Sequence, residues 1–163
     1  MHITTIESQE GSFTACFSKH GLTRLEFPSS LPRATAEGRS NGKASSSELA
    51  RWKKLTTNAL QAALAGKTPA QLPPLDLSSG TEFQQTVWAA LRQIPVGKTT
   101  TYAQVSLQIQ KPLATRAVGS ACGANPIPVL IPCHRVLPKG GGLGGFSGGL
   151  HWKERLLGRE RCE

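Results

Sequence analysis

Two helix-start signals in the second half of the chain constrain its fold more than any other feature. Thr81-Glu82-Phe83-Gln84 and Thr101-Tyr102-Ala103-Gln104 both have the capping-box pattern, in which threonine and glutamine side chains satisfy free backbone N–H groups. Apolar residues follow the first signal at helical spacing, and Ile94-Pro95-Val96-Gly97 interrupts that helix. This half of the chain is therefore predicted to consist of short helices.

A third helix is predicted directly after the second. Lys111-Pro112 ends one helix, and proline suits the first turn of the next, which we expect from Leu113 to Cys122 with Gly123 as its cap. Two short helices joined by a tight turn, the second carrying Arg116 and several small residues, fit a helix-turn-helix. An ordinary helical hairpin with a tight crossing is the alternative.

The first half is patterned differently. Alternating apolar residues between Ile3 and Phe27 predict strands in a hairpin or meander, and 28–47 is predicted to be a loop. A helix is expected from Ser47 to about Ala65, ended by Gly66, followed by a proline-rich linker and a domain boundary near 77–80. The fold class is thus α/β (α+β), and 38% hydrophobic residues suffice for a core.

The charge distribution indicates which binding partners suit this chain, and its cysteines indicate the cellular compartment. The net charge is +9, and no acidic residue occurs between Glu82 and Glu154, a pattern that suits a polyanion such as nucleic acid or simply a basic surface. That interval holds seven basic residues: Arg92, Lys98, Lys111, Arg116, Arg135, Lys139 and Lys153. The spacing of the four cysteines, Cys16, Cys122, Cys133 and Cys162, follows no disulfide pattern. The sequence also contains no apolar run of membrane-spanning length and no signal-peptide pattern, so we expect a cytoplasmic protein with free thiols.

One cysteine lies in a context that suits a nucleophile. The apolar run 127–131, a candidate buried strand, leads into Pro132-Cys133-His134-Arg135-Val136. The thiolate is the reactive form of cysteine, and no carboxylate within twenty residues opposes its formation. Because adjacent residues of a strand face opposite sides, Cys133 and His134 can cooperate only if the chain turns there. The alternative is a buried structural cysteine.

These residues resemble the O(6)-alkylguanine-DNA alkyltransferases, also called methylated-DNA–protein-cysteine methyltransferases. The resemblance covers about residues 80–160 and rests on motifs in the family's order: 83–88, Val96-Gly97, Thr101-Tyr102, Arg116-Ala117-Val118-Gly119, Ala124-Asn125-Pro126, Ile131-Pro132-Cys133-His134-Arg135-Val136, Ser147-Gly148-Gly149-Leu150 and Lys153-Glu154. It implies a ribonuclease-H-like sheet-plus-helix domain over 1–78. A winged helix-turn-helix domain over 79–163 would bind DNA and accept the alkyl group.

The resemblance implies a direct, irreversible repair reaction. The protein would flip O(6)-alkylguanine out of the duplex, and Cys133 would take its alkyl group once per molecule, without a cofactor. His134 would draw off the thiol proton through a water, and Glu160 would orient that histidine. Asn125 would hold the turn that aims the cysteine, and Tyr102 would donate a hydrogen bond to the leaving guanine. Repair of O(4)-alkylthymine stays open.

The remaining implied roles concern binding. The base pocket would be lined by Tyr102, Val136, Phe146 and Ser147, with Phe146 standing where the family often has tyrosine. Arg116 would fill the gap left by the flipped base. Contacts to double-stranded DNA are expected from Arg116, Thr101, Ala114, Thr115, Ala117, Gly119, Lys111 and Lys139. The protein is expected to act as a monomer without a metal, since Cys16, His2 and His20 lack zinc-ligand spacing.

Three other functions are disfavoured. A non-repairing alkyltransferase-like binding protein would lack the cysteine in this motif, whereas Cys133 is present. A cysteine hydrolase would need an oxyanion hole, and a thiol redox enzyme would want a second cysteine within about ten residues of the first.

Overall fold

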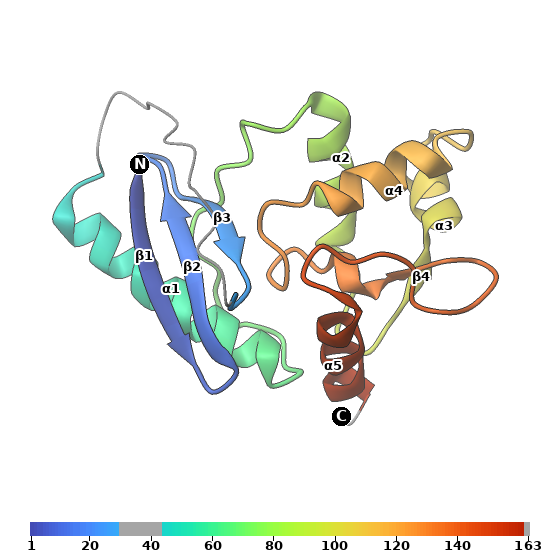
Figure 1. The fold of residues 1–163 in the computed structure, drawn as a ribbon. Coiled ribbons are helices and arrows are strands. Elements are labelled where there is room, and N and C mark those ends of the chain that lie inside the picture. The colour runs from blue at the N-terminus through green and yellow to red at the C-terminus, as the bar shows by residue number, and fades with distance from the viewer. Residues whose placement is uncertain (30–43, 162–163) are drawn as a thin grey trace.

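The computed structural model describes residues 1–29 and 44–161. Its N-terminal sheet consists of β1 (His2–Ser8), β2 (Gly11–Phe17) and β3 (Leu22–Glu26), antiparallel in the order β1-β2-β3. This confirms the expected meander. Helix α1 (Ser46–Leu64) packs against the sheet (Figure 1), and Gly66, with φ of 74°, follows its end as expected.

The second half contains the three expected short helices, α2 (Glu82–Leu91), α3 (Tyr102–Gln108) and α4 (Thr115–Gly123). A fourth helix, α5 (Leu150–Arg161), follows them. Both capping boxes are confirmed, with Thr81 and Thr101 as the N-caps of α2 and α3. Two short strands, β4 (Thr100–Thr101) and β5 (Val136–Leu137), pair in parallel and join the start of α3 to the cysteine motif.

The second helix of the pair α3–α4 differs from its predicted bounds at both ends. Helix α4 begins at Thr115 instead of Leu113, because Ala114 N–H donates to Lys111 O at 2.9 Å and closes a separate turn around Pro112. The cap prediction for Gly123 is wrong: this glycine is the last helical residue, and Ala124 is the C-cap.

The predicted strand over 127–131 is also wrong. The segment is a buried turn in which Ile131 N–H donates to Ile127 O at 2.9 Å and Val129 has φ of 73°. Pro126 and Pro128 explain the difference, since neither can donate a hydrogen bond to a sheet. An apolar run interrupted by prolines folded into a buried turn instead.

One hydrophobic core joins the two halves of the chain. Its buried residues come from the N-terminal sheet, α1, the helices α2 to α5 and the cysteine motif. The core is therefore continuous across 77–80, where the sequence predicts a domain boundary. Within the described residues, no helix has the length and apolar character needed to cross a membrane.

Candidate functional site

The cysteine motif forms a turn, as cooperation between Cys133 and His134 requires. Cys133–Arg135 is a single turn of 3-10 helix between Pro132 and β5, so successive side chains do not point to opposite faces of a strand. Cys133 is 4% exposed and His134 is 1% exposed. The candidate nucleophile thus lies just beneath the surface.

Asn125 holds this turn against the end of α4. Its Nδ2 donates to Ile131 O at 2.8 Å and to Cys133 Sγ at 3.1 Å, while its Oδ1 accepts from Ile127 N–H at 3.0 Å. The amide is buried and bonded on both sides, so its orientation is determined by its partners. One side chain therefore fixes the position of the sulfur relative to the 127–131 turn.

His134 pairs with Glu160 on α5. Its Nε2 lies 2.8 Å from Glu160 Oε1, whereas its buried Nδ1 has no hydrogen-bond partner among the described residues. Burial lowers the pKa of His134 although Glu160 has the opposite effect. The lowered pKa favours the neutral ring. A carboxylate at Nε2 selects the tautomer with the proton there. Nδ1, in the residue that follows Cys133 in the chain, is then free to accept a proton.

Arg135 completes this buried charge cluster. Its Nη2 donates to Glu160 Oε1 at 2.8 Å, its Nε lies 3.1 Å from Oε2, and its Nη1 donates to Ile94 O at 2.5 Å. Burial alone would raise the pKa of Glu160, but the hydrogen bonds from His134 and Arg135 outweigh it and lower that pKa to about 2. Glu160 is therefore ionised at neutral pH.

A second buried cation contacts the main chain of the cysteine motif. Lys153 is 0% exposed, and its Nζ donates to Val136 O at 2.9 Å and to Gly145 O at 3.3 Å. Burial raises the pKa of the Cys133 thiol, while the Asn125 hydrogen bond and the Lys153 charge oppose that rise. Burial likewise lowers the pKa of Lys153.

Sequence reasoning missed the roles of both cations. It counted Arg135 and Lys153 among seven residues facing a polyanion, but both are buried. A signal was available on α5. Lys153 and Glu160 share the buried face of that helix with Trp152, Leu156 and Leu157, and a charge on an apolar helix face must have a partner.

The structure also brings a second thiol toward Cys133. Cys122 lies in α4, eleven residues before Cys133. Burial, and to a smaller extent the charge of Cys133, raise the pKa of Cys122 to about 12. A linear spacing rule could not detect this neighbour, because the helix end and the 127–131 turn fold the chain back on itself.

The predicted pocket residues are only partly brought together. Tyr102 is half-buried, and the β4–β5 pairing places it beside the motif, where burial raises its pKa. A Cβ on Gly144 would lie 3.3 Å from the Tyr102 hydroxyl, so the glycine-rich segment runs close to it. Val136 is buried, whereas Phe146 packs edge-on against Phe27 at 5.6 Å.

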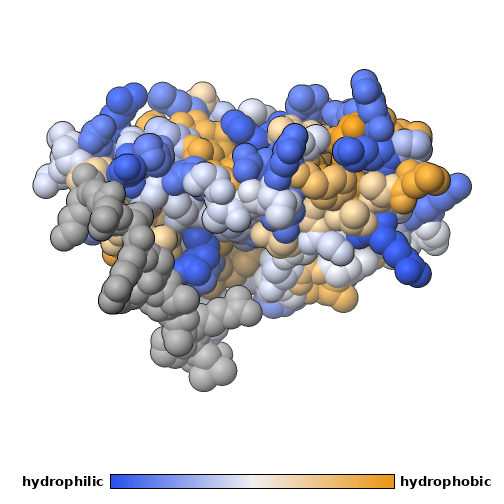
Figure 2. Space-filling view, turned by 90° about the horizontal axis from the view of Figure 1, so that it is seen from above, coloured by the Kyte–Doolittle hydropathy of each residue, from blue (hydrophilic) through white to orange (hydrophobic). Residues whose placement is uncertain are grey.

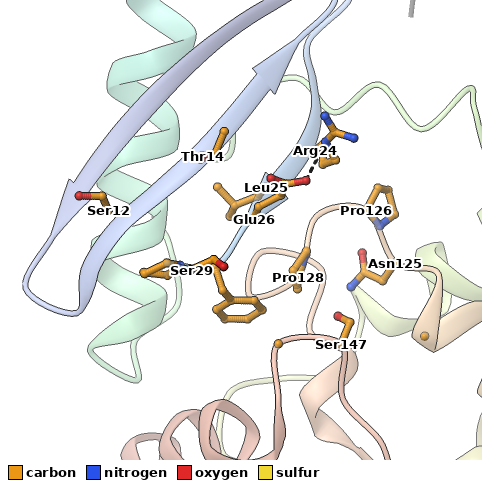
Figure 3. A pocket seen from close by; sticks show the side chains of 14 residues that line it. Ser12, Thr14, Arg24, Leu25, Glu26, Ser29, Asn125, Pro126, Pro128 and Ser147 are labelled. Carbon is orange, nitrogen blue, oxygen red and sulfur yellow. Dashed lines mark ion pairs between the residues drawn. The ribbon is translucent and has the colours of Figure 1, made fainter. Parts of the chain in front are cut away.

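A cavity of about 730 Å³ adjoins this site (Figure 3). It separates strands β2 and β3 from the 123–128 segment, and Asn125 and Ser147 both line it. Tyr102, Val136 and Phe146 do not line it. Its lining residues are Ser12, Thr14, Arg24, Leu25, Glu26, Phe27, Pro28, Ser29, Gly123, Asn125, Pro126, Pro128, Ser147 and Gly148.

Four of the eight residues predicted to contact DNA are exposed, and two of these lie on α4. Arg116 and Ala117 on α4 are exposed, as is Lys111 in the preceding turn. Thr115 and Thr101 are engaged within the protein: Thr115 Oγ1 lies 3.4 Å from Ser106 Oγ, and Thr101 caps α3. Ala114 and Gly119 are half-buried, and Lys139 is exposed.

The surface around these helices carries both hydrophobic and hydrophilic side chains (Figure 2). Figure 2 shows hydrophobic and hydrophilic residues intermingled on the side of the molecule where α2, α3 and α4 lie. Among the described residues, no cluster of three or more histidine, cysteine or acidic side chains could hold a metal ion. Cys16 instead accepts a hydrogen bond from Arg24 Nη2 at 3.5 Å.

Known proteins match both the sequence and this fold. Residues 82–162 match the family model described as the 6-O-methylguanine DNA methyltransferase DNA-binding domain. A methylated-DNA–protein-cysteine methyltransferase from Methanosarcina barkeri is 38% identical over 160 residues, which cover 96% of this chain and 95% of that protein. The crystal structure of Mycobacterium tuberculosis OGT in complex with DNA superposes with a TM-score of 0.72 at 35% identity, covering 99% and 94% of the two chains.

Other relatives match only about half of this chain. The Haemophilus influenzae methylated-DNA–protein-cysteine methyltransferase is 52% identical over 82 residues, which are 50% of this chain and 46% of that protein. The Salmonella typhimurium regulatory protein Ada is 53% identical over 87 residues, 53% of this chain and 24% of that protein. The chain thus spans less than half of these two relatives, whereas the M. barkeri match covers nearly all of both proteins. The chain belongs to the methylated-DNA–protein-cysteine methyltransferase family.

Proposed function

We propose that this protein repairs O(6)-alkylguanine in double-stranded DNA by transferring the alkyl group to Sγ of Cys133. The observation that carries the proposal is the arrangement around that sulfur. Asn125 donates to it at 3.1 Å, and the neighbouring His134 pairs through Nε2 with an ionised Glu160 while its Nδ1 has no partner. The name of the M. barkeri relative and the DNA-bound state of the M. tuberculosis structure support the same reaction.

The transfer is a single displacement. Cys133 Sγ attacks the alkyl carbon, a C–S bond forms, and the C–O bond breaks with its electron pair moving to O6 of guanine. The thiol proton passes to Nδ1 of His134 through a water. The resulting imidazolium is balanced by Glu160 at 2.8 Å, which Arg135 keeps ionised.

The guanine leaves with negative charge, which makes departure difficult at neutral pH. The Tyr102 hydroxyl, next to the glycine-rich segment, donates to the leaving base. The thioether that forms is stable, so each molecule reacts once and irreversibly. No cofactor is required, because the base is restored by the same step that alkylates the sulfur.

Access to the sulfur requires base flipping and local opening. Because Cys133 is only 4% exposed, part of its cover must move, and the proposed route for the extruded base runs between Tyr102 and the segment 138–149, which lies close to the Tyr102 hydroxyl. Gly141, Gly142 and Gly144 in that segment have positive φ, a conformation that glycine adopts without strain. Flipping costs a few kcal/mol, which contacts to the duplex must supply.

Helix α4 is the proposed contact with DNA. Its exposed face enters the minor groove, with Arg116 stacking in the gap left by the flipped base. Lys111 and Lys139 contact phosphates, and Ala117 allows close approach of the helix. A monomer acting in the cytoplasm suffices for this reaction.

The central test is intact-mass spectrometry. Incubation with a duplex oligonucleotide containing O(6)-methylguanine should add one methyl group, and peptide mapping should place it on Cys133. Cys133→Ser should bind the duplex without gaining mass, while Cys16→Ala, which changes a buried thiol in the N-terminal sheet, should still be methylated. A wild-type protein that gains no mass, or a methylated Cys133→Ser variant, would refute the proposal.

The DNA-binding role of α4 has a separate test. Arg116→Ala should slow repair of the duplex more than reaction with free O(6)-benzylguanine, because only the duplex must be flipped. Arg92→Ala removes another exposed arginine, at the end of α2, and should leave the ratio of the two rates unchanged. Equal losses on both substrates for Arg116→Ala would contradict the stacking role.

A further inference from the structure

The end of strand β3 and the residue after it contact two segments of the candidate site, the Asn125–Pro126 turn and the 146–148 segment. Leu25 N–H donates to Pro126 O at 2.9 Å, and Pro126 directly follows Asn125, whose amide holds the sulfur of Cys133. Phe27, two residues after Leu25, faces the 146–148 segment. Figure 3 shows β3 running past both the Asn125–Pro126 turn and Ser147. The N-terminal sheet is therefore in direct contact with the site.

Phe27 is the centre of an aromatic cluster that spans the two halves of the chain. Its ring centroid lies 4.9 Å from that of Trp152, 5.6 Å from that of Phe13 and 5.6 Å from that of Phe146, with the Phe146 ring edge-on. Aromatic pairs in such geometry attract each other beyond the effect of the area they bury. The Phe27 ring therefore links Phe13 of the N-terminal sheet to Phe146 and Trp152 of the second half.

The main chain of the same segment rests on the Phe27 ring. A Cβ added to Gly148 would overlap this ring, so only glycine permits the observed approach. Ser147 lies between Phe146 and Gly148, and both of its neighbours contact Phe27. Ser147 itself is exposed and lines the cavity. One ring thus fixes the segment on either side of Ser147.

The contact with Trp152 extends this support to α5. Trp152 lies in the first turns of that helix, next to Lys153, whose Nζ bonds Val136 O and Gly145 O. Both ends of the 145–148 segment are therefore tied, one by Lys153 and one by Phe27.

We propose that Phe27 is a positioning residue for alkyl transfer: it holds Ser147 and the 146–148 segment at the wall of the base pocket. The inference rests on the proposed function and extends it to the N-terminal sheet, which contributes no group to the reaction itself. Displacing a pocket wall by about 1 Å can slow a positioned reaction by up to a hundredfold, so loss of the ring should reduce the rate.

A matched control distinguishes positioning from general packing. Phe17, an aromatic residue of β2, is 1% exposed, and its ring stacks on that of Trp52 in α1 with 6.3 Å between the centroids. It belongs to the sheet that Phe27 directly follows, but its ring makes no contact with a ring of the 146–148 segment. Phe17→Leu should therefore destabilise the sheet without moving the pocket wall.

The experiment compares Phe27→Leu with Phe17→Leu. Single-turnover methyl transfer from an O(6)-methylguanine duplex, measured over a range of protein concentrations, separates the DNA Kd from the limiting rate. Phe27→Leu should lower the limiting rate by about tenfold with Kd unchanged, and Phe17→Leu should lower the melting temperature at least as much while keeping the limiting rate. Phe27→Tyr, which retains the ring, should restore the rate.

A second variant tests the same contact without altering the sheet. Gly148→Ala would push the segment off the ring and should slow the limiting rate as Phe27→Leu does. Equal limiting rates for the two leucine variants, a loss confined to Kd, or a fully active Gly148→Ala would overturn the inference. If the wild-type protein transfers no methyl group, the proposed function fails instead.

Discussion

Replacing Glu160 by glutamine should destabilise the protein at neutral pH. The substitution keeps an acceptor for His134 Nε2 but removes the negative charge that faces the buried Arg135 guanidinium. Lowering the Glu160 pKa from its usual 4.5 to about 2 corresponds to a stabilisation on the order of 3 kcal/mol. For a chain of this size, the loss should lower Tm by roughly 6–12 °C.

The sign of the pH dependence follows from the lowered pKa. The carboxylate stabilises the folded state fully above about pH 4.5, and this contribution is lost as pH falls toward the folded-state pKa of about 2. Glu160→Gln lacks this titration. The stability difference between wild type and variant should therefore be largest at pH 7 and smaller by about 2 kcal/mol at pH 3.

Urea unfolding followed by circular dichroism at both pH values would measure this difference. Other carboxylates, including Asp76 with its own lowered pKa, are common to both proteins and cancel in the comparison. Glu154→Gln, an exposed site on the same helix, is the control and should change stability by less than about 0.5 kcal/mol. A Glu160→Gln penalty that is absent at pH 7, or equal at pH 7 and pH 3, would refute the reasoning.

Three further substitutions test other parts of the structure. Leu113→Lys places a charge at a fully exposed position just before α4, so the variant should bind duplex DNA more tightly. The slope of log K against log salt should become steeper by about 0.9, and an unchanged slope would show that this turn does not contact DNA. Gly144→Ala, at φ of 70°, should cost about 1 kcal/mol and lower Tm by about 2–4 °C, whereas Gly140→Ala, in open space, should not; equal melting temperatures would contradict the strain argument. Lys153→Met removes a charge that lowers the pKa of Cys133, so the pH profile of methyl transfer should shift upward, and an unshifted profile would exclude that charge from activation.

Local signals predicted the elements that depend on local chemistry. The two capping boxes and the strands of the N-terminal sheet are present because hydrogen bonds and alternation among neighbouring residues determine them. The apolar run 127–131 is not a strand because Pro128 within it and Pro126 before it have no N–H to donate, a property that hydrophobicity alone does not register. Gly123 was misassigned because the helix end at Ala124 is made by backbone hydrogen bonds and not by a left-handed residue.

The site was predictable where a motif is contiguous and incomplete where the fold assembles it. Cys133, His134 and Asn125 were identified by their motif, and the structure brings them together. Arg135 and Lys153 could not be separated from surface charges by counting, because their burial depends on how α5 packs against the cysteine motif. The contact between Phe27 and the 146–148 segment joins residues about 120 positions apart, which no local pattern specifies.

The contacts between the sheet and α5 have a consequence for how the molecule melts. Glu10, in the β1–β2 turn, pairs with Arg155 and Arg159, and Phe13 packs on Trp152, so the hairpin and the last helix share both polar and apolar contacts. Opening either half would strip the other of part of its interior. Heating should therefore give one cooperative calorimetric transition, with no intermediate in which the helices survive after the hairpin has unravelled.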